Sequence, residues 1–143
     1  EQRNVGGRVL SLAISEEAEP DRRILLIDDN EAIAEILAAF LSRYGYKVEW
    51  APDGQQGLDL YKDKMSSCKY DAVLLDLVIP GGMGGKETIG LLRKIDPLAK
   101  AALISGHCDD PVMTGWQDFG FDAAFAKPFR IDELIRGLDE LIG

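Results

Sequence analysis

The sequence predicts an α/β fold, a doubly wound parallel sheet of five strands with five helices, in one compact domain. Short apolar segments rich in β-forming residues recur along the chain, segments with helical spacing separate them, and the connections are short. Strands and helices that alternate in this way form a parallel sheet with right-handed crossovers and helices on both faces. A chain of 143 residues that is 46% hydrophobic buries about two-thirds of its unfolded surface, which favours a single domain.

The five expected strands are the short apolar segments that alternate with the helical ones. They are RILLID (23–28), YKVEWA (46–51), YDAVLLD (70–76), KAALIS (100–105) and DAAFAK (122–127).

Apolar residues at helical spacing predict the helices between and after these strands. The i, i+3, i+4, i+7, i+8 template is followed by Ile33, Ile36, Leu37, Phe40 and Leu41, and again by Ile131, Leu134, Ile135, Leu138 and Leu141. Three further helices are expected after PDG (52–54), after GGMGG (81–85) and within PVMTGWQDF (111–119), the last one short because Gly115 interrupts it. We interpret the Leu, Ile and Met residues of these helices as core residues.

Residues 1–22 differ in composition from the rest of the chain. A strand-like alternation, GGRVLSLAIS (6–15), precedes the acidic stretch EEAEPDR (16–22) with its proline. Such a stretch is typical of a linker. We therefore expect residues 1–22 to be a linker or the remnant of a preceding domain, and residues 23–143 to form the folded domain. Because the chain begins with Glu1, we expect it to be a piece of a longer protein.

Charge and cysteine usage limit the classes of partner and compartment. The net charge of -9 argues against direct binding of nucleic acid or contact with an anionic membrane, since both need an excess of Lys and Arg. Cys68 and Cys108 form no CxxC pair or Cys/His ladder, which suggests reduced thiols in a cytoplasmic protein. Trp50 and Trp116 lie next to expected element ends, and we interpret them as partly buried packing residues.

Polar residues end four of the five expected strands. They are Asp28 and Asp29 after the first strand, Asp76 at the third, Ser105 at the fourth and Lys127 at the fifth. Ligands of doubly wound sheets bind in the crevice at the carboxyl ends of the strands, so these residues should meet at one edge. Three carboxylates brought together repel one another, and a hard divalent cation with oxygen ligands relieves that repulsion. The sequence therefore predicts a metal site, with Mg²⁺ as the expected ion.

The same group of residues is suited to phosphoryl transfer. A carboxylate beside the metal can attack phosphorus in line while an ammonium group and a hydroxyl offset charge on the phosphoryl oxygens. Asp76 would then carry an aspartyl phosphate, and its place at the end of a buried strand would project it into the crevice. The glycines of GGMGG allow the backbone to pass closely around such a site.

In these motifs the chain resembles the receiver domains of two-component response regulators, over about residues 22–143. The resemblance rests on LLIDDN (25–30), VLLDLVIPGGMGG (73–85), LISG (103–106) and AKPF (126–129). It implies a flavodoxin-like sheet with the strand order 2-1-3-4-5. It also implies that Asp76 is the phosphoacceptor.

The resemblance assigns roles to the other strand-end residues. It implies that Asp29, Asp76 and the backbone carbonyl of Val78 bind Mg²⁺, with Asp28 assisting through water. Ser105 and Lys127 would be the hydroxyl and the ammonium that bind the phosphoryl group. Val78 and His107 would occupy the positions that orient water for loss of the phosphoryl group. Asp76, Ser105 and Lys127 are thus the expected reactive residues, and Asp28, Asp29, Asp76 and Val78 are the expected metal ligands.

The function that the resemblance implies is a phosphorylation-controlled switch. The phosphoryl donor would be a phosphohistidine of a sensor histidine kinase or a histidine phosphotransfer domain, and phosphorylation could also drive formation of a homodimer. The chain would assist its own phosphorylation and dephosphorylation without being an enzyme with a separate substrate. Its loop between Pro80 and Gly85 resembles that of receivers attached to hybrid sensor histidine kinases.

Other classes of protein fit the motifs less well. A flavodoxin-like binder of flavin mononucleotide would place its phosphate on the first loop, where DDNEA (28–32) repels it. A phosphatase with an aspartyl intermediate would need a carboxylate at position 78, which is Val. The alternative that stays open is a degenerate receiver that serves only as a protein-docking module, although the complete acid, Ser and Lys set argues against it.

Overall fold

The structure is a computed structural model that describes residues 22–143. It contains a five-stranded sheet in the order β2-β1-β3-β4-β5, in which every neighbouring pair of strands is parallel. The strands are β1 (Arg22–Ile27), β2 (Tyr46–Ala51), β3 (Ala72–Asp76), β4 (Ala101–Ser105) and β5 (Ala123–Ala126). The fold class and the flavodoxin-like strand order that the sequence predicted are therefore confirmed. The predicted linker, residues 1–22, lies outside the described residues apart from Arg22, which begins β1.

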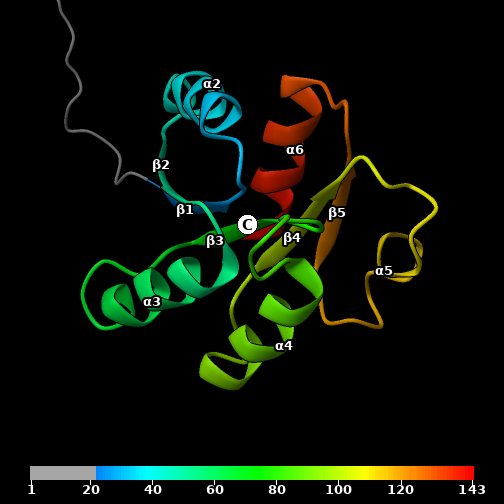
Figure 1. The fold of residues 1–143 in the computed structure, drawn as a ribbon. Helices are drawn as coiled ribbons and strands as arrows, with labels where there is room; N and C mark the ends of the chain where they lie inside the picture. The colour runs from blue at the N-terminus through cyan, green and yellow to red at the C-terminus, as the bar shows by residue number, and fades with distance from the viewer. Residues whose placement is uncertain (1–21) are drawn as a thin grey trace, which may run out of the picture.

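Five helices cover the two faces of this sheet (Figure 1). They are α2 (Glu31–Ser42), α3 (Gly54–Lys64), α4 (Gly85–Ile95), α5 (Pro111–Thr114) and α6 (Ile131–Ile142). Helices α2 and α6 pack on one face, whereas α3, α4 and the short α5 pack on the other. The five helices confirm the prediction, and α5 is short as expected, with Gly115 as its C-cap.

Side-chain caps set the starts of α2 and α3, the helices that follow β1 and β2. The side chain of Asn30 accepts a hydrogen bond from the backbone N–H of Ile33 at the start of α2. Asp53 does the same for Gln56 at the start of α3. Because these caps satisfy backbone donors that have no partner within the helix, each helix begins immediately after the loop that leaves its strand.

The core has two layers, one on each face of the sheet. Side chains alternate along β1, so that Leu25 and Ile27 pack toward α3 and α4, whereas Ile24 and Leu26 pack toward α2 and α6. Every residue of β3 and β4 is buried, as expected for central strands of a parallel sheet that is covered on both faces. These strands carry the rigid backbone that ends at the candidate site.

The interpretation of the α2 Leu and Ile residues as core residues was wrong for Ile33 and Ile36, and Phe40 beside them is exposed as well. Leu37 and Leu41 are buried, but Ile33, Ile36 and Phe40 are 38%, 53% and 39% exposed. The apolar stripe of α2 is wider than the strip of helix that the sheet covers. Its outer residues instead line a groove toward the segment that follows β5.

Cys68 and Cys108 are both exposed and are not joined by a disulfide. Within residues 22–143, every helix is too short or too polar to cross a membrane.

Candidate functional site

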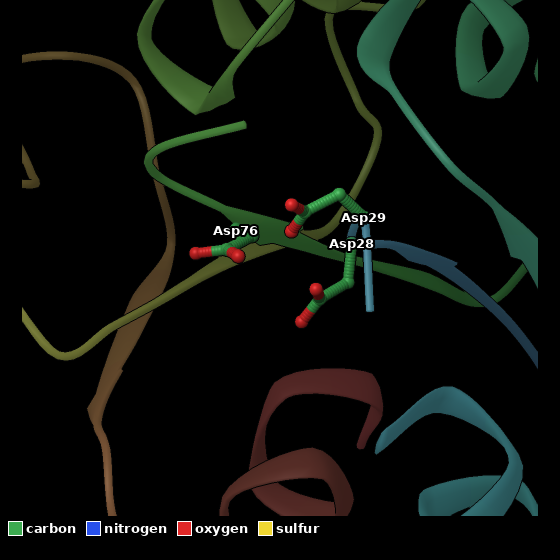
Figure 2. A group of neighbouring side chains, drawn as sticks. All are labelled: Asp28, Asp29 and Asp76. Carbon is green, nitrogen blue, oxygen red and sulfur yellow. The ribbon is translucent and has the colours of Figure 1, made fainter. Parts of the chain in front are cut away.

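Three carboxylates meet at the carboxyl edge of the sheet (Figure 2). Asp28 and Asp29 follow β1, and Asp76 ends β3, the strand that pairs with β1. One oxygen from each carboxylate lies within 4.8 Å of the others. Asp28 and Asp76 are only 1% and 7% exposed, whereas Asp29 is exposed. The side chain of Asp29 points toward that of Asp76, and the side chain of Asp28 lies below them in this view (Figure 2).

Lys127 supplies the positive charge next to these carboxylates. It follows β5, and its backbone N–H donates a hydrogen bond of 2.8 Å to the carbonyl of Ser105 on the neighbouring strand. Its Nζ lies 3.3 Å from Oδ2 of Asp28 and 3.5 Å from Oδ2 of Asp76. The ammonium group therefore bridges the carboxylates of two strands, and it partly neutralises them.

Without a metal ion, the surroundings of Asp76 disfavour a negative charge on its carboxylate. Burial raises the pKa of Asp76 above its ordinary value, and the nearby carboxylates of Asp28 and Asp29 raise this pKa further. Lys127 acts in the opposite direction. Because one ammonium faces three carboxylates, a further cation would stabilise the ionised form.

Asp28 is held in place from both sides. Its backbone N–H donates to the carbonyl of Ala51 at 3.1 Å, and its Oδ1 accepts a hydrogen bond of 2.9 Å from the N–H of Asn30. The indole Nε1 of Trp50 donates a hydrogen bond of 2.6 Å to the backbone carbonyl of Asp28. The sequence identified Trp50 only as a packing residue, and the motifs contained no signal for this bond.

The remaining predicted residues lie at the same edge of the sheet. Ser105 ends β4, is fully buried, and its Oγ accepts a hydrogen bond of 2.9 Å from the N–H of His107. Asp76 pairs in register with Ile104, so Ser105 lies one residue beyond the position opposite Asp76. Val78 is two residues past Asp76 and is 44% exposed.

The glycine-rich loop folds tightly against the end of β3. Gly81 has a φ of +77°, a conformation that L side chains rarely adopt. A Cβ on Gly84 would overlap the carbonyl oxygen of Leu77, and one on Gly85 would lie 3.0 Å from the carbonyl oxygen of Asp76. The N–H of Gly85 donates to the carbonyl of Leu77 at 3.0 Å. The approach at Gly84 requires glycine, and the bond from Gly85 to Leu77 closes the loop that contains Val78.

The donor set fits a hard divalent cation. Carboxylate oxygens are the ligands that Mg²⁺ and Ca²⁺ prefer, and Mg²⁺ in proteins commonly uses one or two carboxylates together with water and phosphate oxygens. Two of the carboxylates are buried and fixed by the strands, and the third is exposed to solvent. A metal at this site, with the ammonium beside it, would offset the charge of an anionic group that approaches Asp76.

The chain belongs to the family of response regulator receiver domains, because residues 24–139 match the model of that family. Receiver domains of this family are the phosphoacceptor domains of two-component signalling, and this chain is one of them. It is 36% identical to a response regulator receiver protein of Anaeromyxobacter over 114 residues. The aligned residues make up 80% of this chain and 46% of that protein. It is 31% identical to the sporulation initiation phosphotransferase F of Bacillus subtilis, and the alignment covers 80% of this chain and 88% of that relative.

Solved structures of receiver domains have the same fold. The response regulator TrrA of Thermotoga maritima, solved in complex with Mg²⁺–BeF, is 32% identical, with a TM-score of 0.71 over 84% of this chain and 98% of that one. The receiver domain of the sensor histidine kinase PA1611 of Pseudomonas aeruginosa, solved with a magnesium ion in its active site cleft, is 26% identical, with a TM-score of 0.75 over 86% and 98%. The chain spans about half the length of the first curated relatives that it matches.

Proposed function

We propose that Asp76 accepts a phosphoryl group from a phosphohistidine, and that Mg²⁺ is held by Asp29, Asp76 and the backbone carbonyl of Val78, with Asp28 assisting. The observation that carries this proposal is the meeting of three carboxylates with the ammonium of Lys127 at one edge of the sheet. The Mg²⁺ in the TrrA and PA1611 structures supports the choice of metal. Bound Mg²⁺ would offset the negative charge of the phosphoryl oxygens.

The reaction forms one bond and breaks one bond. A carboxylate oxygen of Asp76 attacks the phosphorus in line, the new O–P bond forms, and the P–N bond to the donor imidazole breaks. The imidazole leaves with the bonding electron pair, and no oxidant or further reactant is needed. Because the carboxylate is at the end of a buried strand, its approach to the phosphorus is fixed by the backbone.

Lys127 and Ser105 would stabilise the phosphorylated form. The ammonium of Lys127 already lies 3.5 Å from an oxygen of Asp76, so it can pair with a phosphoryl oxygen attached there. The Oγ of Ser105 accepts a hydrogen bond from the N–H of His107, which leaves its own hydrogen available to donate. A turn of this hydroxyl toward the phosphoryl group would remodel the loop after β4, and this is the proposed conformational switch.

The partner of this domain would be a sensor histidine kinase or a histidine phosphotransfer domain, and the domain would have no separate substrate of its own. The similarity to the receiver domain of PA1611 supports a parent of the hybrid histidine kinase type. The place of action would be the cytoplasm, because the phosphohistidine donor obtains its phosphoryl group from ATP.

An apolar groove beside the site favours a helix of the phosphodonor as the docking element. The groove, of about 490 Å³, lies between α2 and the segment after β5, and it is lined by Ile33, Ile36, Leu37, Phe40, Lys127, Pro128, Phe129 and Ile131. Lys127 belongs both to this groove and to the carboxylate site. A donor helix that lays an apolar face in the groove would therefore lie next to Asp76.

Labelling with a small phosphodonor tests the proposal. In the presence of Mg²⁺, acetyl phosphate should produce one base-labile phosphoryl group, which mass spectrometry should place on Asp76. Asp76→Asn should abolish the label, and Asp59→Asn, which changes an exposed carboxylate on α3, should not. Labelling at full rate in excess chelator, or a label on another residue, would contradict the proposal.

A further inference from the structure

We propose that Trp50 is a positioning residue for the metal site, and that its indole N–H orients the backbone from which Asp28 and Asp29 project. This inference rests on the proposed function, because it concerns the Mg²⁺ that Asp29 and Asp76 would bind. The observation behind it is the hydrogen bond of 2.6 Å from Nε1 of Trp50 to the backbone carbonyl of Asp28. No sequence motif of the site includes Trp50.

The bond continues the contact between β2 and β1 beyond the last pair of residues that the two strands share. The paired residues of these strands end with Ile27 opposite Ala51. The N–H of Asp28 still reaches the carbonyl of Ala51 at 3.1 Å. Within residues 22–143, the next backbone group, the carbonyl of Asp28, accepts no hydrogen bond from a neighbouring strand and is bound by the side chain of Trp50 instead.

The carbonyl of Asp28 is part of the planar peptide group that joins Asp28 to Asp29. A donor that fixes the direction of this carbonyl therefore fixes the plane from which the backbone of Asp29 continues. This matters most for Asp29, because its side chain is exposed and is not held by packing. Asp28, by contrast, has the further bonds from Asn30 and Lys127 to its carboxylate.

Tryptophan suits this task for two reasons. Its indole N–H is a donor only, so the bond to a carbonyl has a single possible direction. The ring is rigid and partly buried on β2, so it holds the donor in place at little cost in conformational entropy. Groups that hydrogen-bond to the ligand-bearing part of a metal site commonly change metal affinity by about tenfold or more when they are removed.

The two tryptophans of the chain allow a matched test by titration calorimetry with Mg²⁺ alone. Trp50→Phe should raise the Kd for Mg²⁺ by about tenfold. Trp116→Phe, which changes a partly buried tryptophan that lies beside β5 and α6, should leave the Kd unchanged. Incorporation of benzothienylalanine at position 50, which keeps the ring shape and replaces the N–H by sulfur, should raise the Kd as Trp50→Phe does.

Nuclear magnetic resonance supplies a second measurement, because it observes the indole N–H of each tryptophan directly. The indole N–H resonance that disappears in Trp50→Phe should shift when Mg²⁺ is added, and that of Trp116 should not. A wild-type Kd in the benzothienylalanine protein would overturn the proposal while leaving the proposed function intact. Failure of the wild-type protein to bind Mg²⁺ would instead overturn the proposed function and this inference with it.

Discussion

Lys127 and Asp28 are 99 residues apart in the sequence, yet Nζ of Lys127 lies 3.3 Å from a carboxylate oxygen of Asp28. Asp28 is only 1% exposed, so its charge has little access to water and depends on this partner. The contact joins the end of the first strand to the end of the last one. The ion pair at the site can therefore form only when the last strand has joined the sheet.

Removal of the ammonium should expose the repulsion among the three carboxylates. We expect Lys127→Ala to lower the free energy of unfolding of the metal-free protein by about 2 kcal/mol, because Asp28 loses its ion partner. The loss is not larger, because Lys127 is partly exposed to solvent. Mg²⁺ should still bind, and it should restore more stability in the variant than it adds to the wild type. Urea unfolding with and without Mg²⁺ measures both effects, and equal gains in the two proteins would contradict the explanation.

The apolar groove should matter for a protein donor and not for a small one. Ile36→Glu places a charge on the most exposed residue of the α2 stripe, so it should slow transfer from a phosphorylated histidine phosphotransfer domain by about tenfold or more. Labelling by acetyl phosphate should be unchanged. Leu98→Glu is the matched control, because Leu98 is 84% exposed and lies outside the groove. Equal transfer rates for the two variants would exclude the groove as the docking surface.

The residue at position 78 should control how long the phosphoryl group remains on Asp76. Val78 is exposed beside the site and cannot orient a water for attack, so we expect Val78→Asn to speed loss of the phosphoryl group by about tenfold. His107→Ala should slow the loss or leave it unchanged. Release of phosphate from the phosphorylated domain in Mg²⁺ compares the three proteins. A wild type that is already as fast as Val78→Asn would show that Val78 does not shield the phosphoryl group.

Two glycines should respond to alanine in opposite ways. A Cβ on Gly54 would overlap Oγ1 of Thr88 and lie 2.9 Å from the carbonyl oxygen of Met83, so Gly54→Ala should cost about 2 kcal/mol of stability. A Cβ on Gly90, in α4, would have no heavy atom within 4 Å, so Gly90→Ala should add about 0.5 kcal/mol through helix propensity. Chemical unfolding measures the free energy of unfolding of both variants. A Gly54→Ala variant as stable as the wild type would show that the loop containing Met83 can move away from α3.

Asp96 should make the stability of the protein depend on pH in the acid range. The hydroxyl of Tyr61 donates a hydrogen bond of 2.6 Å to Asp96, and this bond, more than that of Lys69, lowers the pKa of Asp96 below its ordinary value. A lowered pKa in the folded state contributes stability that is present above about pH 4 and is lost as the pH falls through the folded-state pKa.

Asp96→Asn removes this contribution. The free energy of unfolding of the variant should therefore be lower than that of the wild type at neutral pH, and it should fall less steeply below about pH 4. Urea unfolding at a series of pH values measures the slope, with Asp59→Asn as an exposed control. Parallel pH curves for wild type and Asp96→Asn would show that Asp96 is not responsible.

The sequence predicted the strands and the meeting of their polar ends because both follow from short-range patterns. YKVEWA corresponds to the whole of β2, and the rule for strand ends in parallel sheets brought Asp28 and Asp76 to one edge. The exposure of Ile36 could not be predicted in this way, because helical spacing shows which residues share a face and not how much of that face a neighbour covers. The bond from Trp50 to Asp28 depends on the spacing of β2 and β1 beyond their ladder, which no local pattern records.

The position of β5 at the end of the strand order has a consequence for protein synthesis. A chain that is still emerging from the ribosome has all three carboxylates available before Lys127 has been made, but β5 must join β4 before the ammonium can reach them. On the proposed mechanism, a nascent or truncated chain that ends before residue 127 could not hold the phosphoryl group as the finished domain does. A stable phosphorylated form would therefore be confined to molecules in which β5 has joined the sheet.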